Sequence, residues 1–219
     1  MKAWGLASFT ITNKNVETTL RLSPSFSVVG QVRTAEGRTL TELGGAEISL
    51  RPEDGLGVVD WVTQPDANGE FSFKTVAWPR QLLSVAVRQS GTYVKEIRYN
   101  GLPLRSPYVA VAPGAQLEVV LDKGAATIRG TVQGTNNVVL LIRDGVDIPL
   151  PRPYNPFQFM FPPQNGTFGM SVPPGTYRAL ALPRDFEDEN LTAEDLAQRL
   201  ARAEKITLKP NEQKSIELK

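Results

Sequence analysis

The 219-residue sequence predicts an all-β protein of two tandem antiparallel β-sandwiches, with an N-terminal β-hairpin and one short helix in the second sandwich. Three observations predict this fold. Short runs alternate between apolar and polar residues with a period of two, as half-buried strands do. The 18 glycines and 17 prolines separate these runs as turn residues. One strand pattern also recurs at intervals of about one hundred residues, the size of a small sandwich.

The composition excludes several classes of function. The 24 Lys and Arg residues balance 23 Asp and Glu residues, so no net field attracts the chain to nucleic acid or to an anionic membrane. The absence of cysteine and histidine excludes disulfides, zinc sites built from those residues, and catalytic triads that contain them. No apolar run has the length of a signal peptide or a membrane span. We therefore expect no enzyme activity, no cofactor, no nucleic-acid partner and no membrane insertion.

The N-terminal element is predicted to be a hairpin of two strands. It is the first of three segments in which an apolar strand, a polar turn and a second strand follow one another, at residues 9–22, 109–121 and 206–218. The second and third copies each end a stretch of about one hundred residues, which is one sandwich. The chain is therefore expected to have three parts: an N-terminal segment 1–23, a first domain 24–122 and a second domain 123–219.

In the first domain, alternation predicts strands at residues 28–32, 46–50, 70–73 and 83–87. The segment Asp66-Ala67-Asn68-Gly69 precedes the third of them and has two interpretations. Alternating oxygen donors are suited to calcium, but the remaining donors and a distal Glu are missing. Asn-Gly between two strands is typical of a hairpin turn, because both residues tolerate a positive φ, and we favour the turn.

In the second domain, a strand at 127–132 is followed by the proline-rich segment 150–156. Phe157, Phe159 and Phe161 come next, and their alternation places them on one face of a strand. The prolines on both sides are expected to keep that segment at a sheet edge or in a loop, because proline donates no hydrogen bond to a ladder. The three rings are expected either in the sandwich core or at a contact between subunits.

The helix is predicted at 193–203. Thr192 is a suitable N-cap, and Asp195 stands at the reciprocal position of a capping box. The acidic run 185–189 precedes the helix, and its carboxylates suit a solvated loop near the positive end of the helix dipole. A weak cation site is the alternative interpretation of this run.

Several motifs of the first domain resemble a known family. Gly30-x-Val32, Ala46-x-Ile48-x-Leu50 and Asp66-Ala67-Asn68-Gly69-x-Phe71 are similar to the carboxypeptidase regulatory-like domains, which are seven-stranded, transthyretin-like or Cna-B-like sandwiches of bacterial surface and secreted proteins. The second domain departs from the pattern, since Asn165-Gly166 lacks the leading Asp. The resemblance implies scaffolding, adhesion or carbohydrate binding at a bacterial surface or outside the cell. It supplies no catalytic residues.

The N-terminal hairpin has an apolar face that needs a cover, since an isolated hairpin is only marginally stable in water. That face consists of Phe9, Ile11, Val16, Leu20 and Leu22. The hairpin either folds back onto the first domain or belongs to a longer chain, or its strands add to the sheet of a neighbouring subunit. Strand addition of this kind builds a fibre when it runs head to tail. The expected function is therefore a structural or assembly module that associates with itself or with neighbouring β-domains.

A binding function is the alternative. Trp61, Trp78 and Tyr93 are candidates for stacking on sugar rings, as in an adhesion module that binds a glycan or a surface protein. Single aromatic residues of a sandwich more often pack in its core or at its corners, which favours the structural function.

Overall fold

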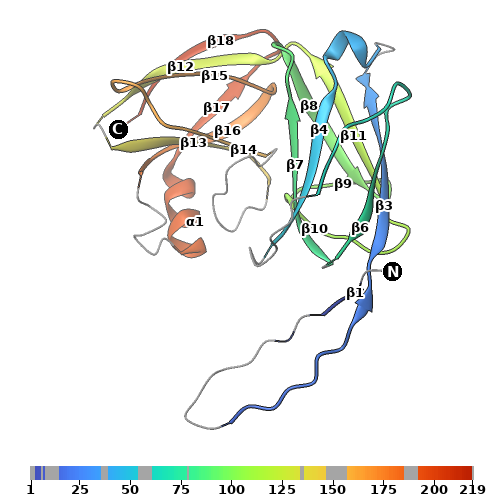
Figure 1. The fold of residues 1–219 in the computed structure, drawn as a ribbon. Coiled ribbons are helices and arrows are strands. Elements are labelled where there is room, and N and C mark those ends of the chain that lie inside the picture. The colour runs from blue at the N-terminus through green and yellow to red at the C-terminus, as the bar shows by residue number, and fades with distance from the viewer. Residues whose placement is uncertain are drawn as a thin grey trace.

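The computed structural model describes residues 3–5, 7, 15–35, 39–53, 61–77, 79–133, 136–146, 157–184 and 192–218. These residues form a chain of β-strands with one α-helix, so the predicted all-β class is confirmed. The strands make two sandwiches that lie next to each other, and a long N-terminal segment projects from the first of them (Figure 1).

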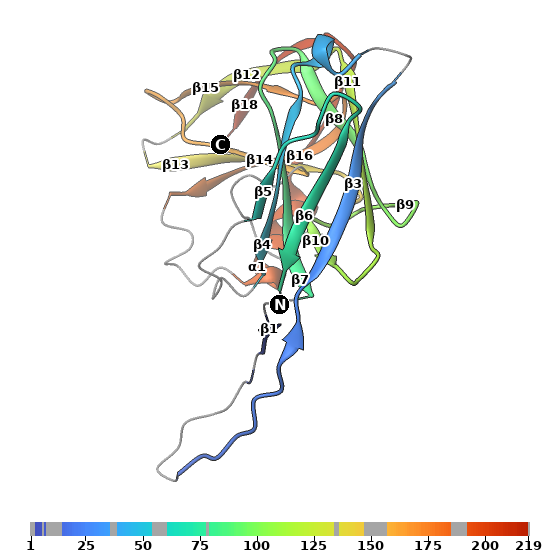
Figure 2. The ribbon, with the colours of Figure 1, turned by 45° about the vertical axis from the view of Figure 1, so that its right-hand side comes forward.

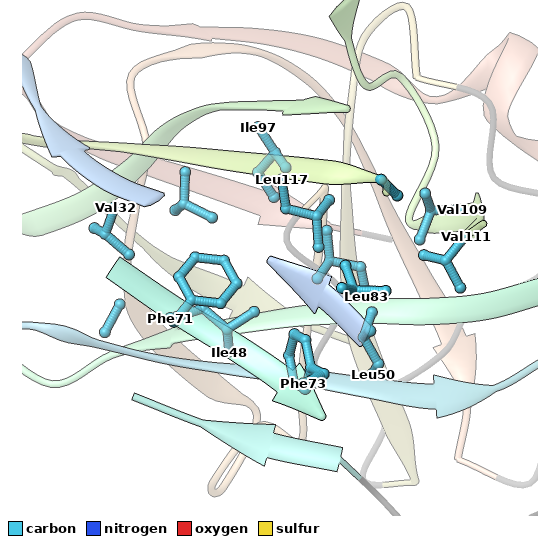
Figure 3. Packing of buried hydrophobic residues seen from close by; sticks show 14 of the residues in the cluster. Val32, Ile48, Leu50, Phe71, Phe73, Leu83, Ile97, Val109, Val111 and Leu117 are labelled. Atoms are coloured by element: carbon cyan, nitrogen blue, oxygen red, sulfur yellow. The ribbon is translucent and has the colours of Figure 1, made fainter. Parts of the chain in front are cut away.

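The first sandwich packs a five-stranded sheet, in the order β6-β3-β11-β8-β9, against a four-stranded sheet, β10-β7-β4-β5. Its strands are β3 (Phe26–Thr34), β4 (Ala46–Pro52), β5 (Trp61–Thr63), β6 (Glu70–Val76), β7 (Arg80–Val87), β8 (Thr92–Tyr99), β9 (Leu102–Pro103), β10 (Tyr108–Ala110) and β11 (Gln116–Lys123). A short 3-10 helix, Thr41–Leu43, precedes β4. The four strands predicted from alternation lie within β3, β4, β6 and β7. Their inward-facing residues fill one apolar core between the sheets (Figure 3).

The second sandwich packs the sheet β15-β12-β18 against the sheet β14-β13-β16-β17. Its elements are β12 (Ala126–Val132), β13 (Asn137–Arg143), β14 (Gln158–Phe161), β15 (Thr167–Val172), β16 (Gly175–Pro183), α1 (Ala193–Arg202), β17 (Glu204–Leu208) and β18 (Gln213–Leu218). The helix covers the outer face of the sheet β14-β13-β16-β17, where Leu196 is buried. Both faces of β13 are therefore buried, and Val138–Ile142 is apolar throughout, as a fully buried strand requires.

The strand–turn–strand segments 109–121 and 206–218 connect differently from the predicted hairpins. β10 pairs with β7 in one sheet, whereas β11 pairs with β3 and β8 in the other. β17 and β18 are likewise divided between two sheets, because β17 pairs with β16 and β18 with β12. Each segment is thus an arch across the sandwich, and β3-β11 and β12-β18 are parallel pairs. Alternation is equally compatible with a hairpin and an arch, since both bury every second residue in the same core.

A glycine in each domain marks equivalent positions of the two sandwiches. Gly30 lies opposite Phe71 on β6 and Leu117 on β11, and a Cβ at Gly30 would stand 2.2 Å from the Phe71 ring. Gly130 lies opposite Phe168 and Ile216 in the same way, and its Cβ would stand 2.7 Å from the Phe168 ring. Only glycine leaves room for the ring that crosses the strand at this position.

In the N-terminal segment, the strand pairing that the structure describes lies outside the predicted hairpin 9–22. β1 (Ala3–Trp4) pairs antiparallel with β2 (Ser23–Pro24). Residues 15–22 have no regular secondary structure and are exposed. The residues 9–14 of the predicted hairpin lie outside the described ranges.

Candidate assembly site

Residues 15–22, which we call the arm, expose apolar side chains on an extended chain. Val16 is 45% exposed, Leu20 52% and Leu22 66%. Their even numbers put them, with Thr18, on one face of any strand that the arm forms, and the polar residues Asn15, Glu17, Thr19 and Arg21 fall on the other face. Phe9 and Ile11, the other two predicted contact residues, lie outside the described ranges. The arm therefore has the pattern of a half-buried strand without a sheet.

The position of the arm is set by its connection to β3. Ser23 and Pro24 lead directly into Phe26, the first residue of β3. Figures 1 and 2 both show the arm leaving the end of the first sandwich that is opposite the connection to the second. The arm and the connection between the sandwiches thus lie at opposite ends of the first sandwich.

The connection between the sandwiches is short and hydrogen-bonded on both sides. Only Gly124 and Ala125 separate β11 from β12, and both amides donate to the Gly91 carbonyl, at 2.9 and 3.1 Å. The Gly124 carbonyl accepts from the Asn211 amide at 2.9 Å. Turns of both sandwiches therefore hold the linker. Leu104 packs against the core of the first sandwich and also against the cluster beneath α1.

Tyr93, a predicted stacking residue, lies beside this connection in a charged group. Its hydroxyl donates to Asp122 Oδ2 at 3.4 Å, and Lys95 Nζ donates to the same oxygen at 2.9 Å. Burial, then the Asp122 carboxylate, raises the pKa of Tyr93. Burial alone would raise the pKa of Asp122, but hydrogen bonds from Lys95 and from the Lys123 amide outweigh it and lower that pKa. Tyr93 is thus half-buried, and its hydroxyl is held by Asp122.

Of the other two predicted stacking residues, the structure describes one. Trp61 is half-buried on β5 and packs against the core of the first sandwich. Trp78 lies outside the described residues. Of the two positions that the structure describes, Trp61 is in the four-stranded sheet and Tyr93 in the five-stranded sheet.

The three phenylalanines face two different apolar clusters. Phe159 and Phe161 pack against the core of the second sandwich, and the Phe159 ring meets the Tyr177 ring edge to face at 6.2 Å. Phe157 is 6% exposed and packs in the cluster beneath α1, together with Met160. The prediction of a single face is wrong for Phe157, because β14 begins at Gln158 and alternation does not extend to the preceding turn. These rings are occupied in packing within the chain.

Of the two candidate cation sites, the structure describes only the one at Asp66. Asp66 Oδ1 accepts from the amides of Asn68 and Glu70, at 2.9 and 2.8 Å, so this carboxylate closes the predicted turn. The acidic run 185–189 lies outside the described residues. Within the described ranges, no three Asp or Glu side chains gather in a group suited to a metal ion.

Two carboxylates of the second domain have lowered pKa values with structural causes. Hydrogen bonding from Lys205, with a further contribution from Arg178, lowers the pKa of Asp144. Hydrogen bonds from the hydroxyl and amide of Thr192 lower the pKa of Asp195, which completes the predicted capping box of α1. Asp144 therefore forms ion pairs and Asp195 caps a helix, so both charges stabilise the fold.

Sequence reasoning missed one concave surface. A groove of about 780 Å³ lies on the five-stranded sheet, between the loop 64–66 and Gly101. Polar and apolar residues line it, and Arg33 Nε forms an ion pair with Glu118 Oε1 at 3.2 Å. The sequence signal for this groove is the outward-facing residues of β3 and β11, because alternation places Gln31, Arg33 and Glu118 on the solvent side of the sheet.

The fold defines an all-β protein of two sandwiches. Comparison with solved structures finds likenesses of low sequence identity. The chain is similar to the Bacillus anthracis TIE protein (11% identity over 92% of this chain and 36% of that one, TM-score 0.33). It is also similar to a streptococcal ancillary pilin (13% identity, 95% and 68%, TM-score 0.31) and to a minor pilin of Streptococcus agalactiae (9% identity, 89% and 94%, TM-score 0.30). The chain spans about a third of the TIE protein.

The sequence comparisons found no relative. No family model matches the chain, and no curated protein matches it. A search of the described residues for a membrane-spanning helix found none of sufficient length and hydrophobicity.

Proposed function

We propose that this protein is a structural, non-enzymatic assembly module of a bacterial cell-surface or extracellular protein, and that the segment 1–23 joins it to neighbouring β-domains by strand addition. The exposed arm carries this proposal. Its three exposed apolar residues alternate with polar ones on a chain that already extends away from the body. Strand addition would pair the arm's backbone and bury that apolar face in a single step.

The two sandwiches to which the arm is attached are suited to a repeating unit of fixed shape. Every sheet is made only of strands that precede the linker in sequence or only of strands that follow it. This separation supports two domains, 24–122 and 123–219. The linker's hydrogen bonds and the position of Leu104 favour a fixed angle between these domains. A fixed angle lets a chain of subunits propagate one geometry, as a fibre requires.

The groove on the first domain favours a second candidate function, the binding of a glycan or of another surface protein. Its polar lining of Gln31, Arg33 and Glu118 supplies donors and acceptors for hydroxyl groups. Trp61 and Tyr93 are not among the described residues that line this groove.

Removal of residues 1–23 tests the proposed function. The full chain is expected to form concentration-dependent oligomers, and the truncated chain is expected to stay monomeric, because the arm supplies the added strand. Sedimentation velocity and negative-stain electron microscopy measure the difference. Circular dichroism is the control, since both sandwich cores remain in the shortened chain. Equal assembly of the two chains would exclude the arm as the connecting element.

A glycan array tests the second candidate. Binding of a sugar by the full chain that is lost in Arg33→Ala, while the truncated chain retains it, would assign recognition to the groove.

A further inference from the structure

The two sandwiches differ at one strand edge. In the first, β11 pairs with β3 on one side and with β8 on the other. In the second, the equivalent strand β18 pairs with β12, and no strand of the described ranges pairs with its other side. Between β16 and β17 the described chain forms α1, whereas the first domain has β8 and β9 at the corresponding place. β18 therefore has an edge whose backbone groups are available for pairing.

The glycines described above fix which residues correspond. Gly30 pairs with Leu117, and Gly130 pairs with Ile216. Leu117-Glu118-Val119 of β11 therefore corresponds to Ile216-Glu217-Leu218 of β18. Both triplets consist of a glutamate between two apolar residues.

The first domain shows what pairs with such a triplet. On β8, Ile97-Arg98-Tyr99 runs antiparallel to 117–119, with Tyr99 opposite Leu117 and Ile97 opposite Val119. Arg98 lies opposite Glu118, and their charged groups are 3.7 Å apart. Ile97 is 1% exposed, and Tyr99 packs against the same core. An arginine between two apolar residues is thus the natural partner of this edge.

The arm carries the same triplet. Leu20-Arg21-Leu22 places an arginine between two leucines, and both leucines are more than half exposed. In the register of β8, Leu22 would lie opposite Ile216, Arg21 opposite Glu217 and Leu20 opposite Leu218. Neither Arg21 nor Glu217 forms an ion pair within the described part of the chain, so both charges are available.

We propose that the arm of one copy adds to the free edge of β18 in a second copy, antiparallel and in this register. The inference rests on the proposed function and names the receiving surface. The occupant is another molecule, because β18 begins beside the linker and the arm leaves the other end of the first sandwich (Figures 1 and 2). The contact joins two different surfaces, so it continues from copy to copy as an open filament.

Charge reversal tests the register. Arg21→Glu and Glu217→Arg each place like charges opposite each other, and each variant alone is expected to raise the critical concentration for assembly by about tenfold or more. An equimolar mixture of the two variants is expected to assemble again. In that mixture, Glu at 21 meets Arg at 217, and the native Arg21 meets the native Glu217. Recovery on mixing excludes misfolding as the cause of the single-variant loss.

Glu204→Arg is the matched control, because Glu204 is an exposed glutamate on β17, the edge strand of the other sheet. It is expected to assemble as the native chain does. If removal of residues 1–23 abolishes assembly while Glu217→Arg leaves it unchanged, the receiving edge is not β18 and the proposed function stands. If the mixture fails to recover, the paired register is wrong. If the truncated chain still assembles, both the inference and the proposed function fail.

Discussion

At the scale of single residues, each domain has a buried polar side chain that donates a hydrogen bond to the backbone just after a strand. Gln81 and Tyr177 are both fully buried. Gln81 Nε2 donates to the Ala77 carbonyl at 2.9 Å, and the Tyr177 hydroxyl donates to the Pro173 carbonyl at 2.6 Å. Each acceptor lies four residues before its donor, just after a strand. A buried polar group is stable only when it is paired, so these contacts fix where the chain turns between the sheets.

Tyr177→Phe is expected to reduce the free energy of unfolding by about 1–2 kcal/mol, because the buried Pro173 carbonyl loses its donor. Burial raises the pKa of Tyr177 far above its ordinary value, since the site disfavours the phenolate. The unfolded tyrosine ionises near pH 10, whereas the folded one keeps its proton. The native chain therefore loses stability progressively above about pH 10.

Urea unfolding between pH 8 and pH 11.5 measures both effects. The stability gap between the native chain and Tyr177→Phe is expected to narrow above pH 10, since phenylalanine does not titrate. A gap that stays constant across this range would contradict the assigned burial of the hydroxyl.

At the scale of elements, one strand-pairing device recurs in both domains. A phenylalanine on the neighbouring strand lies across a glycine, at Phe71 over Gly30 and at Phe168 over Gly130. Because the glycine has no side chain, the phenylalanine of the edge strand (β6 or β15) can lie across the neighbouring strand (β3 or β12). It also places the parallel partner close, because the Ile216 carbonyl would be 2.2 Å from a Cβ at Gly130.

Gly130→Ala is expected to destabilise the chain by about 1–3 kcal/mol, because the new methyl group would overlap Phe168 and the backbone of β18. Gly169→Ala is the control within the same sheet. Its Cβ would meet only the Arg129 side chain at 3.6 Å, an ordinary contact. Thermal unfolding of the two variants measures the difference, and equal melting temperatures would show that β12 and β15 shift to make room.

At the scale of the whole molecule, the connection between the sandwiches decides whether the protein acts as one rigid unit. The hydrogen-bonded linker joins the domains at the Gly91 turn, and Leu104 fills the space between the first core and the cluster beneath α1. The presence of α1 matters here, because it completes the apolar surface that Leu104 contacts.

Leu104→Ala is expected to loosen the angle between the domains while both cores stay folded. Small-angle scattering should report a broader distribution of interdomain distances, and calorimetry should show two transitions in place of a cooperative one. Leu102→Ala is the matched control, because Leu102 is 73% exposed on the edge strand β9. Identical scattering from the two variants would mean that the linker's hydrogen bonds alone hold the angle.

Much of the fold follows from local sequence. The strands at 28–32 and 70–73, the Asp66 turn and the Thr192 cap of α1 were all predicted, because each depends on residues a few positions apart. The predicted face of Phe157 failed for the same reason, since the residue stands just before its strand begins. Of the assembly site, the apolar positions Val16, Leu20 and Leu22 were predicted from their alternation.

The sequence by itself determined which segments are strands, where they turn and which residues face inward, because periodicity and turn chemistry act over short distances. Only the tertiary structure decided that the segments 109–121 and 206–218 are arches, that β11 runs parallel to β3 and β18 to β12, and that β18 has an edge to which no strand of the described ranges pairs. These properties depend on pairing between residues far apart in the chain. Backbone hydrogen bonds are alike for all residue types except proline, so alternation alone does not tell which strands pair or in which direction.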